Sequence, residues 1–76
     1  MKSVQVSLNT IDRVKNFVNE ISKFEYEFEL SSGRYIINAK SIMGIFSLDI
    51  TKPLCLNIHE EEKIDEVMDA LAFYII

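Results

Sequence analysis

The chain has few of the residues that specialised chemistry requires. Its 76 residues include one cysteine, one histidine, one proline, two glycines and no tryptophan. The single cysteine, Cys55, excludes an internal disulfide and indicates a reducing compartment. His59 has no second histidine and no cysteine at ligand spacing, so it reads as a surface residue. Because a glycine-rich phosphate loop is also missing, we expect no metal site and no cofactor.

Basic residues and long apolar runs are also scarce. Eight Lys and Arg stand against twelve Asp and Glu, a net charge of −4, whereas a nucleic-acid binder needs a concentrated basic face. No stretch approaches the roughly 20 apolar residues that cross a bilayer, and none follows Lys2 as in a signal peptide. Hydrophobic residues nevertheless make up 49% of the chain, which supports a packed core. We expect one cytoplasmic domain over residues 1–76, with no nucleic-acid or membrane partner.

Hydrophobic periodicity predicts strands and helices that alternate along the chain. The clearest strand is 24–30, where four apolar residues alternate with three glutamates that read as a solvated face. Ser31-Ser32-Gly33 predicts a hairpin turn in which Gly33 is free to take a positive φ. The other predicted elements are a strand 3–8, a helix 11–22 capped by Asn9 or Thr10, a strand 34–38, a helix 41–48, a strand 54–58 and a last helix opened by Glu60, Glu61 and Glu62.

The predicted order βαββαβα indicates an α+β fold. It implies one four-stranded antiparallel sheet with three helices packed on one face. Ile11, Val14, Val18 and Ile21 form the expected apolar stripe of the first helix.

Residues 40–48 hold the strongest candidate site. Ser41 is placed to cap a helix, its hydroxyl accepting a bond from an N–H two or three residues on, where the helix dipole also favours a phosphate. The run Ile42, Met43, Ile45 and Phe46 is more than one face of so short a helix can bury, so part of it should be exposed. An ordinary capped core helix explains the same residues.

Residues 40–48, together with Ser22-Lys23-Phe24, resemble the HPr family, the small phosphocarriers of the bacterial sugar phosphotransferase system. The resemblance covers most of the chain and implies the HPr-like open-faced β-sandwich. It also implies that Ser41 is phosphorylated by an HPr kinase, with Lys40 adjacent to the added charge of about −1.5 to −2. The implied docking surface for a catabolite-control repressor is Ile42, Met43, Ile45 and Phe46, of which Ile42, Met43 and Phe46 should point outward.

The catalytic motif of that family is missing from this chain. HPr proteins carry a phosphohistidine in a motif of roughly Gly-Ile-His-Ala-Arg-Pro-Ala. Ungapped alignment places Thr10 at the histidine, Asp12 at the arginine and Arg13 at the proline. A threonine phosphate is a stable ester that would end a relay, and Asp12 repels phosphate. The resemblance therefore implies a non-enzymatic regulatory protein with no catalytic residue.

Two alternatives remain open. The chain could be an interaction module without phosphorylation, dimerising or docking through its second helix and its apolar end, 73–76. It could also be a phosphocarrier that uses another residue, for which the sequence offers no candidate.

Overall fold

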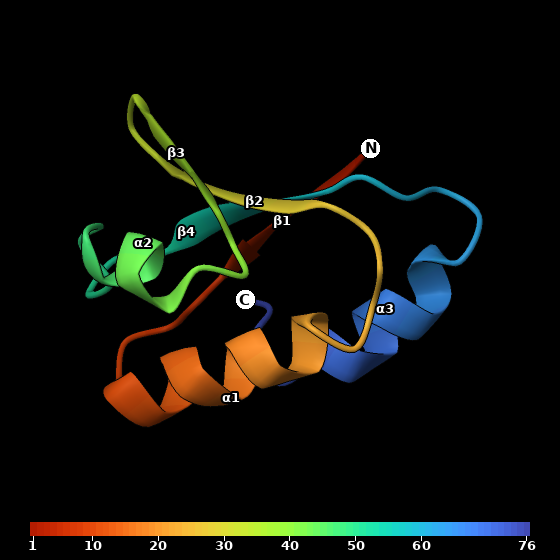
Figure 1. The fold of residues 1–76 in the computed structure, drawn as a ribbon, viewed down its shortest axis with the longest axis horizontal. Coiled ribbons are helices and arrows are strands. Elements are labelled where there is room, and N and C mark those ends of the chain that lie inside the picture. The colour runs from red at the N-terminus through yellow and green to blue at the C-terminus, as the bar shows by residue number, and fades with distance from the viewer.

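The computed structural model describes all 76 residues and confirms the predicted order of elements. They are β1 (Lys2–Val6), α1 (Ile11–Ile21), β2 (Phe28–Ser32), β3 (Tyr35–Asn38), α2 (Ile42–Phe46), β4 (Leu54–Ile58) and α3 (Ile64–Leu71). The strands form one antiparallel sheet in the order β1-β4-β2-β3, and the helices lie on one side of it (Figure 1). None of the helices is long and apolar enough to cross a membrane.

The core fills the space between the sheet and the helices, and every one of its buried residues is hydrophobic. Strand β4 contributes Leu54, Leu56 and Ile58 to this core. Cys55 and Asn57 alternate with them and are half-buried on the open face of the sheet, as predicted. The remaining buried residues are Val6, Leu8, Val14, Phe17, Val18, Ile21, Phe28, Leu30, Ala39, Ile45, Val67, Leu71 and Tyr74.

Helix α1 begins where the sequence places it. Thr10 is the N-cap, and its Oγ1 accepts a bond from the Arg13 N–H at 3.1 Å. The prediction that Ile11 belongs to the buried stripe is wrong, because its side chain is exposed. Ile11 lies in the first turn of the helix, where its side chain is 60% exposed.

The strand predicted over 24–30 is shifted to Phe28–Ser32. Strand β4 reaches only as far as the pair Phe28–Ile58, so residues 24–27 have no ladder partner. One backbone bond holds them to the end of β4, from the His59 N–H to the Glu27 carbonyl at 3.0 Å. The expected alternation in exposure persists without the strand, since Phe24 and Tyr26 are half-buried against the core.

The hairpin turn is one residue shorter than predicted and begins two residues later. Ser31 and Ser32 belong to β2, and the turn is Gly33-Arg34, closed by the pair Ser32–Tyr35. Gly33 has a φ of 61°, as expected, and is the only residue with positive φ. A two-residue turn with glycine at its first position matches the right-handed twist of the two strands.

The three glutamates 60–62 precede α3 and do not open it, contrary to prediction. The Glu60 carboxylate accepts bonds from the N–H groups of Glu62 and Glu61, at 2.9 and 2.7 Å, and these bonds lower its pKa. This local turn competes with the helix, which begins at Ile64.

We expect Tyr74 to make the free energy of unfolding decrease at alkaline pH. Burial, aided by the charge of Glu20, raises the pKa of Tyr74 above its ordinary value of 10.0. The folded state therefore holds the phenol proton more tightly than the unfolded chain does. The resulting stability is present below the unfolded pKa and is lost as pH rises through the folded pKa. Urea unfolding from about pH 8 to about pH 11 should show this loss, and Tyr74→Phe should reduce it, whereas Tyr35→Phe at an exposed ring should not.

Candidate functional site

Ser41 occupies the predicted cap of α2. Its Oγ accepts a bond from the Gly44 N–H at 3.0 Å, and its own N–H donates to the Asn38 carbonyl at 3.0 Å. The residue is half-buried, so the cap faces the surface. Helix α2 ends at Phe46, two residues before the predicted end, because the N–H groups of Ser47 and Leu48 bond three residues back in a tightening last turn.

Glycine at position 44 keeps the surroundings of the Ser41 hydroxyl open. A Cβ at this position would lie 3.2 Å from the Ser41 Oγ and 3.5 Å from the Ile37 Cβ. The absence of that atom leaves space beside the hydroxyl that any other residue type would occupy.

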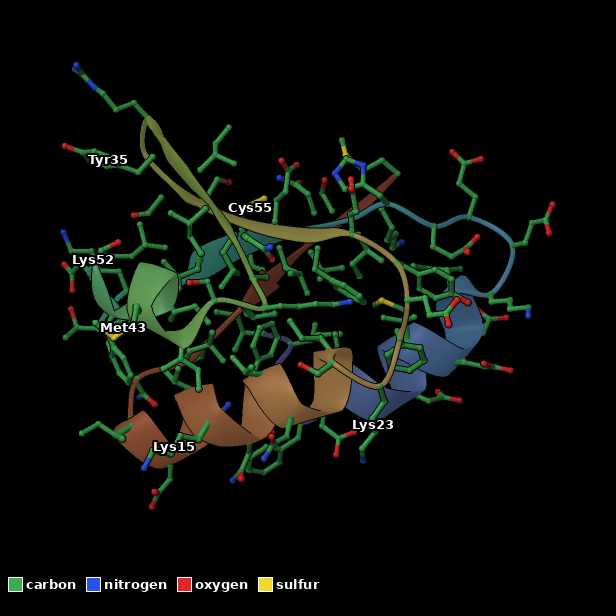
Figure 2. The ribbon with its side chains drawn as sticks, in the orientation of Figure 1. Lys15, Lys23, Tyr35, Met43, Lys52 and Cys55 are labelled. Carbon is green, nitrogen blue, oxygen red and sulfur yellow. The ribbon has the colours of Figure 1, made fainter.

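Three apolar side chains beside this cap are open to solvent. Ile42 and Phe46 are each 39% exposed and Met43 is 82% exposed, and Figure 2 shows Met43 at the outer side of α2. These three residues are called the α2 patch below. The expectation that they point outward is confirmed, but the prediction that Ile45 shares this surface is wrong. Ile45 is fully buried, because it is the one apolar residue of α2 that points into the core.

The Lys40 ammonium is engaged away from the Ser41 hydroxyl. Its Nζ donates to the Phe24 carbonyl at 2.6 Å and lies 5.5 Å from the centre of the Phe28 ring. This contact ties the loop after α1 to the end of β3. The adjacency of Lys40 and Ser41 in sequence therefore does not place a free cation at the cap.

Thr10 caps the start of α1, and the guanidinium of the nearby Arg13 is already bonded to backbone carbonyls. The Arg13 Nε donates to the Ser7 carbonyl at 3.0 Å and its Nη2 to the Phe73 carbonyl at 3.2 Å. The guanidinium also lies 4.6 Å from the centre of the Phe73 ring. This contact between the start of α1 and the end of the chain could not be predicted from the sequence, because no local pattern indicates a partner 60 residues away.

Removing the Arg13 side chain should weaken the fold. Arg13→Ala deletes two charge-assisted bonds and the contact with the Phe73 ring, so we expect the free energy of unfolding to fall by about 1 to 2 kcal/mol. Urea unfolding followed by circular dichroism measures the change. Lys15→Ala, on the exposed side of the same helix, should change it by less than about 0.5 kcal/mol. Equal effects of the two substitutions would contradict the role of the Arg13 contacts.

The single histidine lies apart from both caps. Its Nε2 is 2.8 Å from the Glu29 Oε1, on the open side of the sheet beyond β4, and its side chain is 39% exposed. Cys55 is half-buried on β4, four residues before His59, with its Sγ 3.7 Å from the Asn57 Oδ1. No group of three His, Cys, Asp or Glu residues is arranged to hold a metal ion.

Comparisons with known proteins agree with the fold. The family model described as the PTS HPr component phosphorylation site matches residues 13–75, a range that includes Ser41 and begins after Thr10. A structure of HPr-C-His from Thermoanaerobacter tengcongensis superposes with a TM-score of 0.78 at 28% identity, covering 96% of this chain and 89% of that one. The phosphocarrier protein HPr from Bacillus anthracis str. Ames gives 0.74 at 28% identity, covering 96% and 93%. A search of curated proteins gave no match.

Proposed function

Because the chain belongs to the HPr family of the phosphotransferase system, we propose that it is a regulatory member of that family, phosphorylated on Ser41. HPr proteins are small phosphocarriers that act by contact with other proteins of the system. In this proposal the chain has no catalytic residue of its own and needs no cofactor. Its partners are an HPr kinase and a catabolite-control repressor.

The observation that carries the proposal is the half-exposed Ser41 cap beside the exposed α2 patch. Phosphorylation would add about −1.5 to −2 charge directly next to three apolar side chains. Lys40, its neighbour in sequence, donates its ammonium to the Phe24 carbonyl and so is not directed at the Ser41 hydroxyl. A partner suited to this surface therefore presents a basic group beside an apolar pocket.

Treatment with an HPr kinase and ATP tests the modification. Intact-mass spectrometry should show the addition of one phosphate, which Ser41→Ala abolishes. Ser47→Ala is the matched control, because Ser47 also lies at an end of α2 and its Oγ donates to the Gly44 carbonyl. An unmodified wild-type chain, with a known HPr phosphorylated in parallel, would count against the proposal.

A histidine phosphocarrier role is not part of the proposal, because ungapped alignment with the family motif places Thr10 at the phosphohistidine position. With phosphoenolpyruvate and the first enzyme of the phosphotransferase system, the chain should acquire no label. Thr10→His alone should remain nearly unlabelled, since Asp12 repels phosphate and the Arg13 guanidinium is bonded to the Ser7 and Phe73 carbonyls. Adding Asp12→Arg should raise the labelling. A labelled wild-type chain would overturn this part of the proposal.

An unphosphorylated interaction module is the second candidate, favoured by the exposure of Phe46 and of Phe73 and Ile76 near the end of the chain. Tyr74, in the same end segment, is buried and belongs to the core. Phe46→Glu should then abolish a partner complex or dimer that forms whether or not Ser41 is modified.

A further inference from the structure

The two edges of the sheet are covered differently. Along β1, the end of the chain adds backbone bonds, from the Ser7 N–H to the Tyr74 carbonyl at 2.8 Å and from the Ile76 N–H to the Gln5 carbonyl at 3.0 Å. Strand β3 is the other edge, and nothing pairs with its outer side. Figure 1 shows the β2–β3 hairpin projecting at one end of the molecule, away from α1 and α3.

The alternation of hydrogen-bonded pairs along β2 and β3 places the backbone N–H and C=O of Ile36 on the open edge of the sheet. The Ala39 N–H bonds the Phe28 carbonyl at 2.9 Å, so the pairs on this ladder that exchange bonds include Leu30–Ile37 and Ser32–Tyr35. Ile36 lies between them, opposite Ser31, and its N–H and C=O therefore face away from β2. An unpaired strand edge of this kind is a template for another strand.

The same strand exposes two large hydrophobic side chains. Tyr35 is 67% exposed and Ile36 is 63% exposed. The two side chains lie on opposite faces of the sheet, so a strand paired with β3 would cover both of them. Neither residue belongs to the α2 patch.

Opposite charges lie at the two ends of β3. Arg34, in the hairpin turn, is exposed, and no ion pair or hydrogen bond holds its guanidinium. At the other end, Asn38 lines a surface pocket of about 360 Å³ together with Glu25, Glu27 and Glu29. Lys40 is the one basic residue of this pocket, and its Nζ is bonded to the Phe24 carbonyl, so carboxylates dominate the pocket.

We propose that two copies of the chain pair through their β3 strands, antiparallel, about a two-fold axis at Ile36. Ile36 of each copy then exchanges N–H···O=C bonds with Ile36 of the other, and Tyr35 lies opposite Ile37. Two residues further on, Arg34 of each copy lies opposite Asn38 and at the mouth of the acidic pocket of the other. The four strands of each copy join into one continuous sheet.

A second copy is the occupant that the charges favour. The pairing is isologous, so one geometry satisfies both arginines and both acidic pockets at once. Because β3 has only four residues, the interface is smaller than that of a permanent dimer, and the association is weak and dependent on concentration. This inference does not depend on the proposed phosphorylation of Ser41.

Sedimentation of the unmodified wild-type chain over a wide concentration range tests the association. The mean mass should rise from 8.8 kDa towards twice that value as concentration increases. Arg34→Glu places a carboxylate at the acidic pocket and should weaken the dimer at least tenfold. Lys15→Glu makes the same change of charge on α1 and should leave the dimer unchanged. Circular dichroism confirms that each variant is folded.

A mixing experiment tests the register of the pairing. Arg34→Glu alone and the double variant Glu25→Lys/Glu27→Lys alone should both be mainly monomeric. Mixed together, they should form a heterodimer, because each arm of the pair then joins opposite charges. A wild type that stays monomeric at millimolar concentration would overturn the proposal. A dimer that survives Arg34→Glu, or two variants that do not associate when mixed, would also overturn it.

Discussion

Phe17→Ala is expected to lower the free energy of unfolding by about 3 to 5 kcal/mol. A chain of this length has about 4 to 11 kcal/mol in total, so the variant should be close to unfolded. Phe17 is fully buried on α1, and its ring packs nearly perpendicular to that of Tyr74 with 5.5 Å between the ring centres. Truncation at this position therefore leaves a cavity between α1 and the end of the chain, which the surrounding side chains fill only in part.

Urea unfolding followed by circular dichroism measures this loss. Phe17→Leu keeps most of the volume and should cost less than about 1.5 kcal/mol, so a measurable midpoint remains even if Phe17→Ala is unfolded. Phe73→Ala removes the same side chain from a position that is 73% exposed and should cost about 1 kcal/mol or less, mainly through its contact with Arg13. Similar losses at positions 17 and 73 would show that burial does not determine the effect.

The order and type of all seven elements could be predicted, because each has a clear hydrophobic period or a turn residue. Their boundaries could not. The pattern of alternation from Phe24 to Leu30 records which side chains face the core, but a strand also needs a neighbour. Whether that neighbour reaches residues 24–27 depends on where β4 ends, which residues 24–30 do not encode.

The candidate site shows the same division between local and distant contacts. The Ser41 cap and the exposure of Ile42, Met43 and Phe46 could be predicted, because both depend on residues within one helical turn. The engagement of Lys40 by Phe24 and of Arg13 by Phe73 could not, because 16 and 60 residues separate the partners. Lys40 is next to the proposed phosphorylation site Ser41 in sequence, and Arg13 is close to Thr10, which aligns with the phosphohistidine of the family. Both cations are nevertheless bonded to carbonyl groups elsewhere.

If the α2 patch docks a partner, Met43→Glu should nearly abolish the complex. Met43 is 82% exposed, so its side chain contributes little to the fold, and substitution leaves the Ser41 cap intact. In a complex it would be buried at the centre of the patch. A carboxylate there must be desolvated against apolar groups, beside a phosphate of the same sign. We expect a loss of about 2 to 4 kcal/mol, which corresponds to binding weakened about 30- to 1,000-fold.

The measurement is calorimetric titration of the Ser41-phosphorylated chain with a catabolite-control repressor. Ile36→Glu is the matched control, because Ile36 is also a mostly exposed hydrophobic residue, but on the β3 edge. It should leave repressor binding unchanged while abolishing the β3-paired dimer, and Met43→Glu should do the reverse. Each substitution therefore serves as the control for the other surface. If both substitutions weakened repressor binding equally, loss of general surface hydrophobicity would explain the result, and the assignment of docking to α2 would be wrong.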